Sequence, residues 1–252
     1  MIDAPPRHLE ANMAGRKKAI SQYQEPLTPQ EVAAGMNAAR RNAARLLEDA
    51  KRLFEAKSYA SAASIAILSI EESGKLSLLR GIATADGEKE LKAEWRAYRD
   101  HQSKNVGWIF AELVANGARR LTDFSPVQDP NSDHPAVIGT VNQLGFYTDC
   151  YGDRHWSEPI EVIDERLAKT MLAVAEIKCP THETSTREIE LWVKHIHRGV
   201  SKAEGLQDLV NWHADVEREG LAHYSTEEMR SFVLGEGVDF LDGANESVPK
   251  KQ

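Results

Sequence analysis

The chain contains 252 residues, and its shares of hydrophobic residues (41%) and charged residues (28%) are typical of a globular protein that buries a substantial core. Its formal net charge is −8 at neutral pH. This acidic balance excludes a protein that coats nucleic acid without specificity, because phosphate binding needs a basic field. Any contact with nucleic acid must therefore come from a local groove or from the pairing of two protomers.

The composition also predicts the compartment. Two cysteines, Cys150 and Cys179, are too few for a framework of disulfides and indicate reduced thiols. The first residues carry no apolar run of the kind found in secretory signals. No stretch approaches the roughly 20 apolar residues that a membrane-spanning helix needs. We therefore expect a cytoplasmic protein with no membrane segment.

A clear start signal marks the first helix, after residues 1–26, which lack periodicity and are predicted to form a flexible N-terminal arm. Thr28, Pro29 and Glu31 make a capping box with proline at the first helical position. Apolar residues then recur at alternating steps of three and four residues as far as Leu53. This spacing predicts an amphipathic helix that ends shortly after that residue.

The second helix is predicted to be capped by Ser58 and to end near Ile82. It differs from the first helix because residues 62–70 are apolar or small on every side. A helix that is apolar all round lies in the middle of a bundle. We therefore expect this helix to be a central one, with its alanines and serines allowing close approach of the neighbours.

The remaining elements complete an all-α prediction, with an antiparallel helix bundle over residues 27–178. A third, continuous helix is predicted after Gly87 and ends around Asn116. Proline-rich residues 122–135 predict a long loop. The rest is expected to comprise a short helix at 136–146, a helix from 157 to 178, two amphipathic helices in a C-terminal extension at 179–235 and a flexible tail at 236–252, with no strand set and no internal repeat.

Charged residues interrupt the apolar second helix. Glu71, Glu72 and Lys75 lie near its centre, and an unpaired buried charge costs several kcal/mol, so such groups are normally paired or face a cleft. Glu71 and Lys75 have a favourable spacing for an ion pair, whereas Glu72 lies on an apolar line and is predicted to point further inward. Gly74 disfavours a helix interior, so another backbone is expected to pass close by. The alternative is that this segment is simply an exposed end of the helix.

The third helix carries a second polar cluster, formed by Arg96, His101, Lys104 and Asn105. His101 and Lys104 share one face with Trp108. Arg96 precedes His101 by five residues, which places the two about 140° apart on an ideal helix. They could therefore meet only across a symmetric dimer or where the helix is distorted. The alternative is a solvated, charge-rich helix face.

These segments together resemble the AbiV family of bacterial abortive-infection proteins, over about residues 36–178. The most specific element is Glu71-Glu72-Ser73-Gly74-Lys75 in its helical context, with Ser73 departing mildly from the family pattern. Residues 180–252 find no counterpart in the resemblance. The other matching segments are Leu46-Leu47-Glu48-Asp49-Ala50, Tyr59-Ala60, Ala66-Ile67-Leu68-Ser69-Ile70, His101-x-x-Lys104, and Leu144-Gly145-Phe146-Tyr147-Thr148-Asp149 followed by Trp156 and Pro159.

The resemblance implies a fold and an activity. AbiV proteins are grouped with the HEPN superfamily, whose members are helix bundles that often dimerise. Many of these cleave RNA without a metal, through an arginine followed four to six residues later by a histidine, and Arg96 and His101 satisfy that loose spacing. The family is also similar to proteins that stop phage growth by shutting down translation. We therefore expect a homodimer that acts in phage defence, as a ribonuclease or a translation inhibitor.

If the protein cleaves RNA, the residues take distinct roles. His101 would serve as general base or acid, since an imidazole titrates near neutral pH. Arg96 would stabilise charge developing on the phosphate. Lys104 or Lys75 would add a second cation, held by one of the glutamates. The predicted catalytic residues are therefore Arg96, His101, Lys104 and Glu72, with support from Glu71, Lys75 and Asn105.

A non-enzymatic interaction module is the rival prediction. There the charged cluster would fix helix register and dimer geometry, and the function would be to bind a phage or host protein. Neither reading needs a cofactor. No metal site is expected, because the nine histidines form no recognised ligand pattern, and no phosphate-binding loop or serine-hydrolase elbow is present. Trp192 and Trp212 fall on or beside an apolar stripe and are predicted to be core residues.

Overall fold

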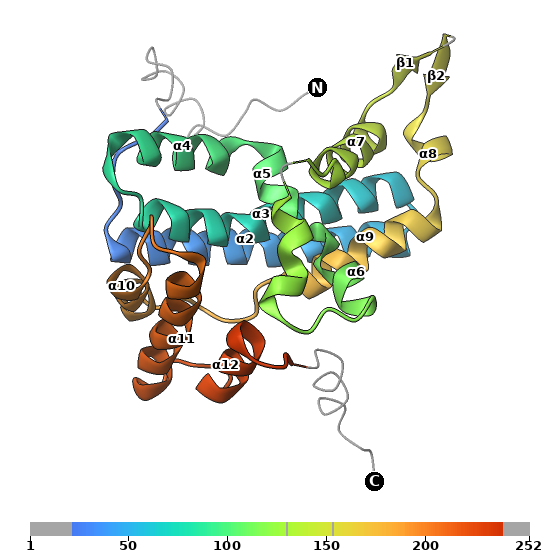
Figure 1. Ribbon diagram of the computed structural model, residues 1–252. Coiled ribbons are helices and arrows are strands. Elements are labelled where there is room, and N and C mark those ends of the chain that lie inside the picture. Colours follow the sequence, from blue (N-terminus) through green and yellow to red (C-terminus); the bar gives the residue numbers. More distant parts are fainter. Residues whose placement is uncertain (1–21, 130, 153, 239–252) are drawn as a thin grey trace.

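A computed structural model describes residues 22–238 with the exception of 130 and 153 (Figure 1). Most of the predicted arm and tail, residues 1–21 and 239–252, therefore lies outside the described residues. The described chain is built from helices with one two-stranded sheet, which confirms the predicted all-α class. Within the described residues, no helix is long and apolar enough to cross a membrane.

Two long antiparallel helices form the base of the bundle. α2 (Pro29–Glu55) starts at the predicted capping box, in which the Thr28 side chain accepts from the backbone of Glu31 and the Glu31 carboxylate accepts from the backbone of Thr28. α3 (Tyr59–Ala83) follows after a short turn and packs along α2. Ser58 occupies the N-cap position of α3, but its side chain makes no capping hydrogen bond.

α3 is the central helix of the structure, as its all-round apolar sequence predicts. It packs against α2, α4 (Gly87–Arg99), α5 (His101–Asn105), α7 (His134–Phe146) and α9 (Glu165–Lys178). Its small residues lie at the closest approaches, and Ala62, Ala63, Ser64 and Ala66 are fully buried. Figure 1 shows α3 between α2 and the pair α4 and α5.

The predicted third helix is wrong in one respect, because it breaks at Asp100. There the backbone leaves the helical region (φ −77°, ψ 130°), and the Asp100 side chain caps α5 by accepting from the backbone of Ser103 at 2.7 Å. Aspartate favours this position because its short carboxylate satisfies the free amides of a new helix. The 3₁₀ helix η1 (Val106–Ile109) and α6 (Phe110–Ala115) continue the segment.

Other local predictions are corrected in the middle of the chain. The proline-rich loop contains the 3₁₀ helix η2 (Leu121–Gln128). The helix predicted from residue 157 is divided into α8 (Pro159–Val162) and α9, because Asp164 caps α9. A hairpin of β1 (Asp149–Tyr151) and β2 (His155–Ser157), paired antiparallel, was not predicted, since three-residue strands are too short to show alternation.

The C-terminal extension contains three helices, α10 (Thr186–His195), α11 (Lys202–Arg218) and α12 (Thr226–Leu234), where the sequence predicted two. Each begins with a serine–glutamate capping box, so Ser225 and Glu228 offered a signal for the missed α12. The extension packs on the bundle. The Asn37 side chain exchanges two hydrogen bonds with the backbone of Thr184, at 2.8 and 2.9 Å, and Ile189 is fully buried in the core.

At Gly74 the backbone of α5 lies close against α3. A Cβ atom added at Gly74 would lie 2.0 Å from the carbonyl oxygen of Lys104. The sequence prediction that another backbone passes this glycine is therefore confirmed. The close approach brings the polar residues of α5 against the charged turn of α3.

We predict that Gly74→Ala destabilises the protein by about 1–3 kcal/mol, because the added methyl group meets backbone that can move only with the whole of α5. Gly139→Ala in α7 is the matched control, since nothing lies within 4 Å of its added Cβ. It should leave stability unchanged or raise it by up to about 1 kcal/mol. Urea unfolding measures both, and equal effects of the two changes would contradict this account of Gly74.

Candidate functional site

The centre of the candidate site is the carboxylate of Glu71 on α3, whose side chain is only 6% exposed. Three side chains of α5 reach it. One carboxylate oxygen lies 2.7 Å from Nδ1 of His101 and 3.3 Å from Nζ of Lys104, and the other accepts from Nδ2 of Asn105 at 3.3 Å. A single buried acid therefore holds the imidazole, the ammonium and the amide of α5 together.

The burial and the ion pairing of Glu71 and Glu72 differ from the prediction. Glu72 was expected to point further inward, but Glu71 is the buried one, and Glu72 is half-buried. The reason lies in the packing of α3: Ile65 and Leu68, which share the line of Glu72, are themselves only half-buried. Lys75 pairs with Glu72 at 2.6 Å, and not with Glu71 as its spacing allowed.

His101 joins the buried acid to solvent. Its side chain is 70% exposed although Nδ1 contacts the buried carboxylate. An ionised carboxylate only accepts hydrogen bonds, so the contact assigns the proton of a neutral imidazole to Nδ1. Nε2 then carries the free lone pair. This arrangement gives His101 the orientation that a general base needs, with the acid behind it and the basic nitrogen free.

Lys104 and Asn105 face the interior. Both residues are buried, Lys104 at 8% exposure and Asn105 completely. A buried ammonium needs a paired charge, and Glu71 supplies it. Both side chains are therefore committed to holding the carboxylate, which leaves neither free to meet a substrate phosphate in this arrangement.

Arg96 has no partner in the cluster. It lies on α4, before the break at Asp100, and its side chain is exposed. Within the described residues its side chain makes no hydrogen bond or ion pair. The predicted site residues thus fall into three groups: Glu71 with His101, Lys104 and Asn105; Glu72 with Lys75; and Arg96 alone.

Two residues that shape the site were not among the predicted ones. Asp100 sets the direction of α5 and so places His101 over Glu71. Its signal was available, because Asp100 precedes Ser103 at the spacing of an N-cap. Tyr98 lies under the ammonium of Lys75, 5.5 Å from Nζ to the ring centre, and only the tertiary contact of α4 with α3 identifies it.

The described residues contain no group of three or more histidine, cysteine, aspartate or glutamate side chains that could hold a metal ion. His195 and His197 have different partners: Nε2 of His195 lies 2.7 Å from Asp215, and Nδ1 of His197 lies 3.6 Å from Asp208. Lys194 and His195 hold the pKa of Asp215 well below its usual range by hydrogen bonding to its carboxylate. These contacts tie α10 to α11.

Comparison with known protein families identifies a family for this chain. The family model HEPN_AbiV, described as AbiV, matches residues 31–179, which run from α2 to the residue after α9. No curated protein and no solved structure matches the chain. The matched region contains every residue of the candidate site, and the C-terminal extension lies beyond it.

We predict that Glu71→Gln and Glu72→Gln separate the roles of the two acids. Glu71→Gln leaves Lys104 as a buried charge without its counter-ion and should destabilise the protein by about 3 kcal/mol. Glu72→Gln removes a half-buried ion pair with Lys75 and should cost less than about 1 kcal/mol. Thermal and urea unfolding measure both changes, and a larger loss for Glu72→Gln would reverse the assignment.

Proposed function

This chain belongs to the AbiV family of HEPN proteins, and we propose that it is a phage-defence effector that cleaves RNA without a metal. The observation that carries the proposal is the contact between His101 and Glu71. An exposed imidazole backed by a buried carboxylate is an arrangement for proton transfer at neutral pH. We assign catalysis to the outer nitrogen of this imidazole.

The proposed reaction is an internal transfer within the RNA. Nε2 of His101 accepts the proton of a ribose 2′-hydroxyl, and the 2′-oxygen forms a bond to the adjacent phosphorus. The bond from phosphorus to the 5′-oxygen breaks, and that oxygen leaves with a proton supplied by an acid. The products are a 2′,3′-cyclic phosphate and a 5′-hydroxyl. Glu71 stabilises the imidazolium that forms on His101.

Arg96 is the proposed phosphate-binding residue. Of the cations in the two predicted clusters, Lys75 and Lys104 are paired with glutamates, whereas Arg96 is exposed and makes no ion pair within the described residues. A guanidinium stays charged and can bind a phosphate through two parallel hydrogen bonds. We propose that Arg96 stabilises the negative charge that grows on the phosphate oxygens during the transfer.

We further propose that two protomers form the working unit. A net charge of −8 gives one chain a poor field for RNA. A symmetric dimer that faces its two α4–α5 segments toward one cleft would contribute two copies each of Arg96 and His101. One imidazole would then accept the 2′-proton while the other supplies a proton to the leaving oxygen.

A second candidate function, binding of a phage or host protein, is supported by the buried side chains of the same cluster. Lys104 and Asn105 use Glu71 to lock α5 on α3, which is what a module that presents a fixed surface to a phage or host protein requires. In that case His101 completes the lock and performs no chemistry. Translational arrest with intact RNA would favour this function.

We predict that His101→Ala abolishes RNA cleavage and toxicity while the fold is kept, because the side chain is 70% exposed and Glu71 retains Lys104 and Asn105. Arg96→Ala should lower the cleavage rate by about 100-fold or more, as expected for the loss of one charge-stabilising donor. The assay incubates purified protein with total RNA in the presence of a chelator.

His155→Ala is the matched control, since His155 is an exposed histidine on β2, distant in the fold from α5. It should cleave RNA at the wild-type rate. Cleavage that persists in His101→Ala would remove His101 from the mechanism. If the chelator abolished cleavage by the wild-type protein, the proposal that the reaction is independent of metal would be wrong.

A further inference from the structure

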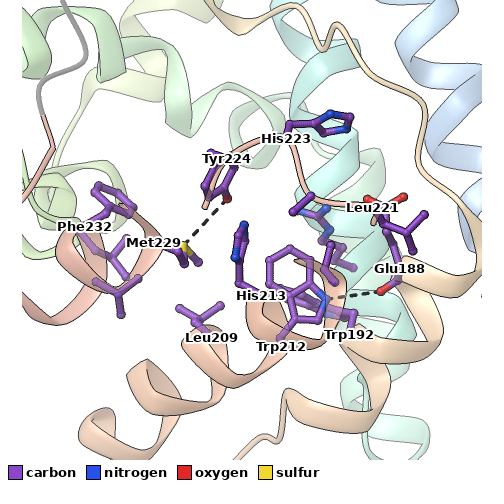
Figure 2. Close-up of a pocket in the computed structure, with 15 residues that line it drawn as sticks. Glu188, Trp192, Leu209, Trp212, His213, Leu221, His223, Tyr224, Met229 and Phe232 are labelled. Carbon is purple, nitrogen blue, oxygen red and sulfur yellow. Dashed lines mark hydrogen bonds between the residues drawn. The ribbon is translucent and has the colours of Figure 1, made fainter. Parts of the chain in front are cut away.

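The C-terminal extension and α3 enclose a cavity of about 320 Å³ that the proposed ribonuclease site does not use. Figure 2 shows Trp192, Trp212, His213 and Tyr224 around it, together with Met229. Arg80 of α3 also lines the cavity. A volume of this size is at the lower end of small-molecule sites and is too small for a folded partner or a nucleic-acid strand.

Arg80 is a cation that forms no ion pair with the described residues of this cavity. Its guanidinium lies over the rings of Trp192 and Trp212, 5.1 and 5.5 Å from their centres. Within the described part of the chain it makes no hydrogen bond and no ion pair, and its Nε is shielded from solvent with no partner. Burial lowers the pKa of Arg80, but an arginine remains charged near neutral pH.

A second donor at the cavity is also unsatisfied. Nε1 of the Trp192 indole is buried and makes no hydrogen bond to any described residue. The polar atoms that lack partners at this cavity are therefore both donors. Buried donors without acceptors are uncommon in proteins, and each one calls for an explanation. Both point to a site that is short of acceptors, in which the guanidinium of Arg80 favours an anion.

Glu188 places one negative charge at the same cavity, and this charge raises the pKa of Arg80. Its carboxylate lines the same space but accepts from the backbone of Ser185 at 2.6 Å as part of the capping box of α10. It forms no ion pair with Arg80. Two histidines, His213 and His223, also line the cavity, and burial lowers the pKa of His213. Arg80 is thus left without a hydrogen-bonded acid at the cavity, and it is the group to which we assign an anionic ligand.

The walls of the cavity favour a planar ring. Tyr224 stacks on His213 with ring centres 4.4 Å apart, and Trp192 and Trp212 meet edge to face at 5.1 Å. Tyr224 keeps 48% of its surface exposed at the mouth of the cavity, so a ring can reach it from outside. Aromatic walls beside an arginine suit a heteroaromatic ring that carries a phosphate.

We propose that this cavity binds a nucleoside monophosphate, with its phosphate on Arg80 and its base against the aromatic side chains of α10, α11 and the loop before α12. The aromatic residues of the site lie beyond residues 31–179, the part that matches the family, whereas Arg80 and Leu121 of the lining lie within it. The site is therefore a feature that the extension adds to the bundle. It does not depend on whether the protein cleaves RNA.

The test is a titration of the full-length protein with AMP, GMP, CMP and UMP. Tryptophan fluorescence and calorimetry measure the binding. At least one nucleotide should bind saturably, and adenosine and inorganic phosphate should each bind at least about tenfold more weakly than the best nucleotide. Arg80→Met should weaken binding of that nucleotide by at least about tenfold. The melting temperature of Arg80→Met should be kept or raised, since it replaces an unpaired buried cation with an apolar side chain.

Arg187→Met is the matched control, because Arg187 lies on the same extension but pairs with Glu190 and Glu219 outside the cavity. It should bind the nucleotide as the wild type does. Tyr224→Leu is a second variant, on an exposed side chain, and should also weaken binding. Failure of all four nucleotides to bind would overturn the proposal, as would undiminished binding by Arg80→Met or Tyr224→Leu. Phosphate binding as strong as nucleotide binding would overturn it as well.

Discussion

The carboxylate of Glu71 is the constraint on which the rest of the site depends. A buried acid is costly unless charged and polar donors surround it, and three side chains of α5 do so here. That requirement fixes α5 against α3, which in turn requires a residue without a side chain at Gly74. The break at Asp100 releases α5 from the direction of α4, so that His101 can reach the acid while staying largely in solvent.

α3 connects the two parts of the molecule that carry function in this account. Glu71 faces α5 in the region that matches the AbiV family, and Arg80 faces the C-terminal extension. The two residues are nine positions apart, which corresponds to roughly 13 Å along a helix. A ligand on Arg80 and a substrate at His101 would therefore bind to opposite parts of the same rigid element, the first held by the extension and the second by the family's own bundle.

The sequence predicted the helical class, the start of α2 and the central place of α3, because capping boxes and apolar periodicity are local signals. The resemblance to AbiV proteins also led us to predict that α3 and the segment around His101 lie side by side. The sequence pattern favoured Glu72 as the inward glutamate, which is wrong, because a helix covered on most sides has no single buried face to identify from the sequence. The break at Asp100 was missed because the stripe that begins with Leu91 and Trp95 keeps its helical spacing across it, although the stripe is polar at Gln102 and Asn105. The role of Arg80 depends on tryptophans that lie far away in the chain.

The most direct test of the central claim is nitrogen NMR of the His101 imidazole, with the resonance assigned by comparison with His101→Ala. Contact with the buried Glu71 carboxylate predicts that the neutral ring carries its proton on Nδ1, the minor form in free histidine, and that Glu72→Gln leaves this signal unchanged. A ring that carries its proton on Nε2, as free histidine mostly does, would contradict the paired acid and imidazole.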